Sequence, residues 1–279
     1  MKIQYENVKL PECDCTNVPV QLTDETIKER LNKVLDRMNC ENFDSLVIYA
    51  DLEHGNNFEY LTGFLPRFEE ALLILNTNGN HYMVLGNENL NKASKARIKA
   101  TPIHCPYFSL PNQPMDVKKG IKDILSQCGF DKANKVGIVG WKNFTSNYED
   151  NSQLFDVPYY IVDTIRDIFG YNIYNATRLF IGDNGARCTN NVNEIVHYEF
   201  GAALASDCIL KAMNHLDVGV SEMELGDILN AYGQKNSVVT IAASGPRFIK
   251  ANIYPTNNTV KLKDPISLSI GYKGGFSSR

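Results

Sequence analysis

The side chains best suited to chemistry in this chain lie near its C-terminal end. Residues 264–279 form a short apolar run followed by a glycine-rich stretch, which predicts a buried strand turning into a hairpin. Upstream, a Ser-Gly-Pro-Arg sequence ends at Arg247. The hairpin serines suit binding a polar ligand better than activating water, and a guanidinium holds a carboxylate through two hydrogen bonds. An exposed arginine in a polar loop is the plain alternative for Arg247.

His54 is the histidine placed where functional side chains commonly lie. It stands in the polar segment 53–57, shortly after an apolar run that predicts a strand. We therefore keep His54 as a candidate ligand-binding residue. The other histidines are more typical of surface or packing positions, and they are His81, His104, His197 and His215.

Well-known catalytic and nucleotide-binding motifs are absent from the sequence. Residues 137–142 contain glycine and lysine without the spacing of a phosphate-binding loop. Neither G-x-S-x-G nor H-E-x-x-H occurs. The pair Cys13 and Cys15 forms a lone C-x-C, whereas a zinc site usually needs four ligands. The residues alone assign no catalytic centre.

The apolar pattern over the first 175 residues predicts strands that alternate with helices. Such alternation indicates an α/β domain. Thr23 is the expected N-cap of the first helix. The predicted helices are 24–39, 89–100, 115–128 and 157–169, and the predicted strands are 45–50, 71–75, 81–85 and 135–139.

A second unit is expected from residue 176 onward. Its pattern predicts helices at 191–216 and 222–231 and strands at 237–243 and 265–270. On the long helix, the predicted core stripe contains Ile195, Tyr198, Ala202, Ala205 and Ile209. The apolar strand faces would be exposed or covered by a partner if the natural chain ended at Arg279, whereas a longer chain would complete the domain. These faces include Val238, Ile241, Leu268 and Ile270.

The order of several short motifs resembles the creatinase/prolidase family. Residues 57–64 (NFEYLTGF) resemble the N-x-x-Y-L-T-G-F signature of the family's N-terminal domain. Arg187 with Glu194 resembles the opening of its catalytic domain, and residues 219–225 resemble its G-x-[ST]-E-x-E-L turn. The resemblance extends from about residue 25 to residue 279.

This resemblance implies both a fold and an assembly. Residues 1–175 would form an α/β creatinase-like N-terminal domain, which is ribonuclease H-like. Residues 176–279 would form the first part of an α+β pita-bread domain. The family comprises Xaa-Pro aminopeptidases, prolidases, creatinases and methionine aminopeptidases, and dimers are common in it. We therefore expect a homodimer in which the N-terminal domain supplies dimer contacts and one wall of the pocket.

The departures from the family pattern concern its metal site. In the family's peptidases two aspartates help to bind two Mn, Co or Zn ions. Here Ser269 stands at the first position, and the second falls in the Ser278–Arg279 region. A neutral hydroxyl does not replace an anionic ligand of a hard divalent ion. The family's histidine corresponds to Asn252, which has no titratable nitrogen near neutral pH. We therefore expect no metal cofactor.

Three functions follow from these features. Three substitutions at one site favour a non-catalytic fold that binds a small peptide or small polar ligand. The alternatives are a metal-free C–N hydrolase resembling creatinase, and an active metallo-aminopeptidase if the natural chain is longer. The predicted ligand-binding residues are His54, Arg247, Asn252, Tyr254, Ser269, Ser277 and Ser278.

Composition excludes other classes of function. The formal net charge of −4 argues against a general nucleic-acid or anionic-membrane binder, because both need a basic face. No apolar run approaches the roughly 18 residues of a membrane helix, and the first residues lack the apolar core of a signal peptide. The seven cysteines fit a reducing compartment. We expect a cytoplasmic protein.

Overall fold

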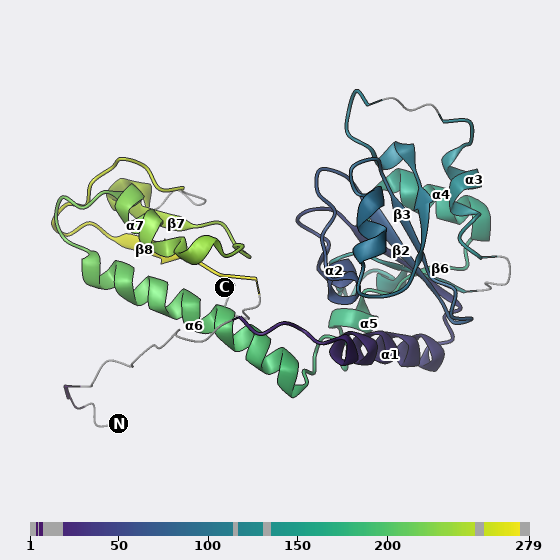
Figure 1. Ribbon diagram of the computed structural model, residues 1–279, viewed down its shortest axis with the longest axis horizontal. Coiled ribbons are helices and arrows are strands. Elements are labelled where there is room, and N and C mark those ends of the chain that lie inside the picture. Colours follow the sequence, from purple (N-terminus) through teal and green to yellow (C-terminus); the bar gives the residue numbers. More distant parts are fainter. Residues whose placement is uncertain are drawn as a thin grey trace. The chain divides into compact units, whose positions relative to one another are not determined.

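The computed structural model describes residues 4, 6–7, 19–113, 117–130, 135–248 and 254–273. The chain divides into two compact units (Figure 1). The N-terminal unit is Thr23–Asn190, and the C-terminal unit is Asn191–Arg279 together with Met1–Leu22. No described helix combines the length and the apolar character that crossing a membrane requires.

A six-stranded mixed sheet forms the centre of the N-terminal unit, in the order β4-β3-β2-β1-β5-β6. Strand β1 pairs antiparallel with β2 and parallel with β5. All residues of β1, β2 and β5 are buried, as expected for central strands that are covered on both faces. The strands are β1 Ser45–Ala50, β2 Ala71–Asn76, β3 Tyr82–Leu85, β4 Thr101–His104, β5 Val136–Val139 and β6 Ile173–Asn175.

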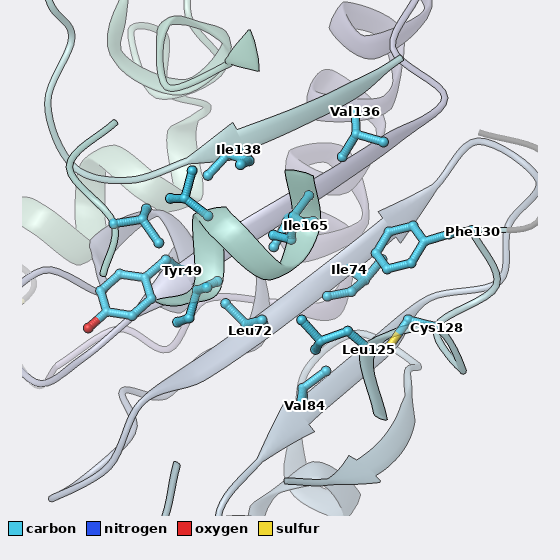
Figure 2. Close-up of a cluster of buried hydrophobic side chains, with 14 of the residues drawn as sticks. Tyr49, Leu72, Ile74, Val84, Leu125, Cys128, Phe130, Val136, Ile138 and Ile165 are labelled. Atoms are coloured by element: carbon cyan, nitrogen blue, oxygen red, sulfur yellow. The ribbon is translucent and has the colours of Figure 1, made fainter. Parts of the chain in front are cut away.

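Helices and short 3₁₀ turns surround this sheet. A large apolar core joins β1, β2, β3 and β5 to α3 and α4, and Figure 2 shows Leu72, Ile138 and Ile165 within it. The helices are α1 Asp24–Cys40, α2 Asn56–Thr62, α3 Ile121–Leu125, α4 Tyr159–Phe169 and α5 Arg178–Ile181. The 3₁₀ turns are η1 Leu90–Lys95, η2 Pro106–Phe108 and η3 Asn151–Gln153.

The C-terminal unit packs two helices against a two-stranded antiparallel sheet. In that sheet Ile241 pairs with Ser269 and Ala242 with Leu268. The buried side chains of this core include Leu204, Cys208, Leu225, Leu229, Ala242, Ile270 and Tyr272. The elements are α6 Val192–His215, α7 Glu222–Leu229, η4 Ala231–Gly233, β7 Ile241–Ser244, η5 Gly245–Arg247 and β8 Ile266–Ser269.

Most of the predicted elements are confirmed, and two helices are corrected. The segment 89–100 contains the 3₁₀ turn η1 instead of an α-helix, because the buried Asn89 bonds to the neighbouring loop through its side chain. The predicted helix 115–128 is shorter, since α3 begins after Gly120 and ends at Leu125. Strands β4 and β6 and helices α2 and α5 were not predicted, and the predicted strand 237–243 begins only at Ile241, as β7.

Two packing predictions in the C-terminal unit are corrected in part. Ile195 is exposed, and Glu194 is buried in its place, because Glu194 forms a reciprocal capping box with Asn191. Ile270 and Leu268 pack against the helical core, so the helices cover these strand residues. Ala205 and Ile209 of the predicted stripe do belong to this core, together with Leu204, Cys208 and Ala212.

The division between the units follows Asn190, whereas a boundary at residue 176 was expected. Hydrogen bonds hold the intervening residues to the N-terminal unit. The Thr177 hydroxyl accepts from the Gly140 N–H at 3.0 Å, and the Tyr60 hydroxyl donates to the Ala186 carbonyl at 2.9 Å. Residues 176–190 are thus part of the first unit.

Candidate functional site

Polar and aromatic side chains meet at one edge of the six-stranded sheet. Asp51 directly follows β1 and Trp141 follows β5, and these two strands are parallel. Glu70 directly precedes Ala71, which pairs with Ala50 at the end of β1. The carboxyl ends of parallel strands are where α/β sheets commonly bind ligands. We call this group the acidic edge, and it contains Tyr49, Asp51, His54, Glu70, Trp141 and Tyr160.

Asp51 organises the loop that carries His54. One carboxylate oxygen accepts the backbone N–H groups of Glu53 at 2.8 Å and of His54 at 2.6 Å. The other lies 2.9 Å from the His54 ring nitrogen Nδ1. Burial acts to raise the pKa of Asp51, but these hydrogen bonds outweigh it and hold the pKa below its usual value. Asp51 therefore stays ionised near neutral pH.

Trp141 stacks on His54 and is held by the turn after β5. The two ring centroids are 4.6 Å apart, and the rings are inclined by 29°. Asp156 accepts the backbone N–H groups of Trp141 and Lys142 at 2.6 and 2.7 Å. A Cβ atom at Gly140 would lie 2.0 Å from an Asp156 oxygen, so this turn requires glycine. The Trp141 residue is 42% exposed, and the Lys142 ammonium lies 4.7 Å from its ring centroid, as a cation bound at this edge would.

Glu70 and two tyrosines complete the acidic edge. The Tyr160 hydroxyl donates to Glu70 at 3.4 Å, and the Tyr49 hydroxyl donates to Asp51 at 3.2 Å. Burial raises the pKa of Glu70, and the negative charge of Asp51 adds to this effect. Burial, followed by the charge of the neighbouring carboxylate, also raises the pKa of each tyrosine. In Figure 2 the Tyr49 hydroxyl lies at the border of the apolar core.

The acidic edge is suited to binding a positively charged group. It presents an ionised carboxylate, a second carboxyl group and a half-exposed indole within one set of adjoining loops. An ammonium or guanidinium group gains both from charge pairing and from contact with an aromatic face.

The segment 57–64 fixes this edge from behind. The Asn57 amide donates to the Gly140 carbonyl at 2.8 Å, next to Trp141. Its oxygen accepts from the Arg187 guanidinium at 2.8 Å. The Asn57 side chain is 2% exposed. Gly63 ends α2 with φ of 78°, a conformation that glycine adopts without strain. The NFEYLTGF segment therefore acts structurally, by holding β5 and residue 187 to α2.

In the C-terminal unit, a buried carboxylate joins three segments. Glu222 begins α7, and its side chain is fully buried. It accepts hydrogen bonds from the Ser244 N–H at 2.8 Å and from the Thr256 hydroxyl at 2.8 Å. Nε of Arg247 lies 3.2 and 3.1 Å from its two oxygens. Burial acts to raise the pKa of Glu222, but bonds from Thr256, Ser244 and Asn258 lower it overall. The role of Glu222 was not predicted from the sequence. The only sequence feature that marks it is its position directly after the N-cap residue Ser221.

The comparisons with known proteins identify the first unit. Residues 30–166 match the family model described as the Creatinase/Prolidase N-terminal domain. The chain carries a creatinase/prolidase N-terminal domain. No curated protein matches the chain in sequence.

Solved structures resemble the chain beyond its creatinase/prolidase N-terminal domain. A prolidase from Thermococcus sibiricus is 18% identical, with a TM-score of 0.64, and the match covers 88% of this chain and 62% of the prolidase chain. Dipeptidase PepE from Mycobacterium ulcerans is 15% identical, with a TM-score of 0.63, and the match covers 90% of this chain and 62% of the dipeptidase chain. Xaa-Pro dipeptidase from Bacillus anthracis is 14% identical, with a TM-score of 0.59, and the match covers 88% of this chain and 61% of that dipeptidase chain.

These likenesses concern the fold. They confirm an α/β creatinase-like N-terminal domain followed by part of an α+β pita-bread domain. The chain spans about three fifths of the length of these solved structures. At such low identity the comparison establishes the fold, and any activity has to be argued from the residues of this chain.

The predicted site residues fall in different places. His54 belongs to the acidic edge of the creatinase/prolidase N-terminal domain. Arg247 was predicted to hold a ligand carboxylate, but it pairs with the internal carboxylate of Glu222 and donates to the Tyr254 carbonyl at 2.9 Å. The Tyr254 residue is 66% exposed. Asn252, Ser277 and Ser278 lie outside the described residues.

The register of β7 and β8 shows on which face of the sheet Ser269 lies. Ser269 lies opposite Ile241 and therefore shares its face of the sheet. Leu268 projects to the other face and packs against the helical core. Ser269 therefore faces away from α6 and α7. Within the described parts of the chain, no three His, Cys, Asp or Glu side chains are grouped to hold a metal.

Proposed function

We propose that this protein binds a short peptide or another small polar ligand, through a positively charged group, without metal-dependent catalysis. The observation that carries the proposal is the acidic edge, where His54 contacts both the ionised Asp51 and the half-exposed Trp141. The similar solved structures are described as prolidases and dipeptidases, which supports a peptide as the ligand.

The chemistry of Ser269 supports independence from metal. This hydroxyl stands at the position where the family resemblance implies an aspartate ligand, and the neighbouring Ser267 on the same face is also neutral. A hard divalent cation binds mainly through the charge of its carboxylate ligands. The described donors on this face therefore do not fit a Mn, Co or Zn pair. A homodimer and a cytoplasmic location, implied by the resemblance and the composition, remain part of the proposal.

Neutralising the acidic edge should weaken ligand binding. We expect Asp51→Asn and Glu70→Gln each to raise the Kd for an Xaa-Pro dipeptide by about fivefold or more, because each removes a charge facing the ligand amine. Calorimetric titration with chelator present measures this. Glu53→Gln, an exposed acid in the same loop, is the matched control and should leave Kd unchanged. Equal affinities for all variants, or binding that chelator abolishes, would contradict the proposal.

A second function is favoured by one observation, the opposite pKa shifts of Asp51 and Glu70. Two carboxyl groups with separated pKa values are the usual arrangement of a general base and a general acid. A metal-free C–N hydrolase would use them in this way. Turnover of a dipeptide or a small amidino compound that persists in chelator and disappears in Glu70→Gln would establish this alternative. Binding without turnover would leave the first proposal standing.

A further inference from the structure

A separate surface of the N-terminal unit gathers positive charge and aromatic rings. It is formed by the loop after α2 and by the 3₁₀ turn η1. We call it the basic surface and define it as Phe64, Arg67, Phe68, Lys92 and Lys95. Such a group is unexpected from composition, because the chain as a whole has a net charge of −4.

Hydrogen bonds of the buried Asn89 hold the two segments of the basic surface together. The Arg67 N–H donates to the Asn89 side chain at 3.1 Å, and that side chain donates to the Arg67 carbonyl at 3.1 Å. Asn89 is fully buried, and its amide also donates to Glu69 at 2.7 Å. Lys92 and Lys95 lie three residues apart in η1, a spacing that places 3₁₀ side chains on one face. The surface therefore has a defined geometry.

Two cations of the basic surface lie over aromatic rings. The Arg67 guanidinium lies 4.6 Å from the Phe68 ring centroid, and the Lys92 ammonium lies 5.7 Å from that of Phe64. The nearby acids have partners of their own: Glu69 accepts from Asn89, Glu88 from Gln113, and Asp24 from Arg97. Among the described residues, no carboxylate forms an ion pair with Arg67 or Lys95.

Phe68 is held in a strained conformation at the centre of this surface. Its φ is 68°, in the left-handed region that a bulky side chain rarely occupies. The residue is nevertheless 60% exposed, so its ring contributes little to the core. Strain of this kind persists where the surroundings impose it, and it is concentrated at binding and catalytic sites. An exposed ring kept at such a cost indicates a contact made outside the unit.

We propose that the basic surface docks an acidic segment of another polypeptide. The planar fork of Arg67 matches a carboxylate in two hydrogen bonds. The exposed Phe68 ring beside it offers an apolar contact of the kind that anchors protein interfaces. A short acidic segment is favoured over a nucleic acid, because the net charge of −4 repels a long polyanion. This docking is a second function, in addition to ligand binding at the acidic edge.

Charge reversal tests the docking directly. The probe is a short labelled peptide of glutamate and leucine residues, followed by fluorescence anisotropy with the whole protein. We expect the double variant Arg67→Glu/Lys95→Glu to raise the Kd at least about tenfold. The matched control is Lys118→Glu/Lys119→Glu, the same charge change on exposed residues that precede α3, and it should leave Kd unchanged. The proposal would be overturned if both double variants lost affinity equally, if the natural chain did not bind the peptide, or if it bound an oligonucleotide of equal charge more tightly.

Phe68→Gly separates docking from folding. Glycine adopts a φ of 68° without strain, so the variant should be at least as stable to heat as the natural chain. It should nevertheless bind the glutamate–leucine peptide more weakly, because the ring is lost. Unchanged peptide affinity would show that the ring takes no part in docking, and a lower melting temperature would show that the fold itself needs the ring; either result would contradict the proposal.

Discussion

Replacing Glu222 with alanine is expected to destabilise the C-terminal unit by about 3–5 kcal/mol. The carboxylate is fully buried and joins α7 to Ser244, Arg247 and Thr256. Its removal leaves the Arg247 charge and several donors without their acceptor, and also leaves a cavity. Urea unfolding followed by circular dichroism gives the free energy of unfolding. A loss of this size is comparable to the stability of a small domain.

Asp227→Ala is the matched control for Glu222→Ala. Asp227 lies on the same helix and is exposed, so its loss should change the free energy of unfolding by no more than about 0.5 kcal/mol. If Glu222→Ala cost no more than this control, the carboxylate would not be the centre of the unit.

The pH dependence of the same unit follows from Glu222. Hydrogen bonds hold its folded-state pKa below the unfolded value of about 4.3. A carboxyl group with a lowered folded-state pKa contributes stability above the unfolded pKa, and this contribution is lost as the pH falls through the folded pKa. The natural chain should therefore lose stability as the pH falls below about 4. Glu222→Gln should lack this component of the loss.

Asn57→Ala is expected to destabilise the N-terminal unit by about 2–4 kcal/mol. Asn57 is buried, and its amide group satisfies the Gly140 carbonyl on one side and Arg187 on the other. Alanine leaves the buried carbonyl without this donor and releases the turn that carries Trp141. Thermal and urea unfolding measure the loss. Asn56→Ala makes the same chemical change at an exposed residue of α2 and should cost much less.

Local sequence patterns predicted the elements whose ends are set by neighbouring residues. Thr23 caps α1 as expected, with its hydroxyl accepting from the Thr26 N–H at 3.2 Å. The turn around Gly79 joins β2 to β3 with the positive φ that an Asn-Gly sequence favours. Strand β4 was missed because its residues are mostly exposed and carry no apolar alternation. Its pairing with β3 is decided by the sheet as a whole.

The candidate site was predictable only in part. His54 was recognisable because it follows a buried strand in a polar loop. Its contact with Trp141 spans 87 residues of sequence and depends on the pairing of β1 with β5. The residue type of Arg247 predicts a carboxylate partner, and in the structure that carboxylate is Glu222, which lies in a different segment. Long-range pairs of this kind follow from tertiary packing, which local patterns do not encode.

The fluorescence of Trp141 tests the central claim most directly. It is the only tryptophan of the chain, and it stacks on His54 in the acidic edge. Chelator-treated protein would be titrated with an Xaa-Pro dipeptide while the emission is recorded, with Asp51→Asn in parallel. Ligand binding at the acidic edge without metal predicts a saturable change in the natural chain that weakens in Asp51→Asn. No change in chelator, with a change appearing only after manganese is added, would contradict it.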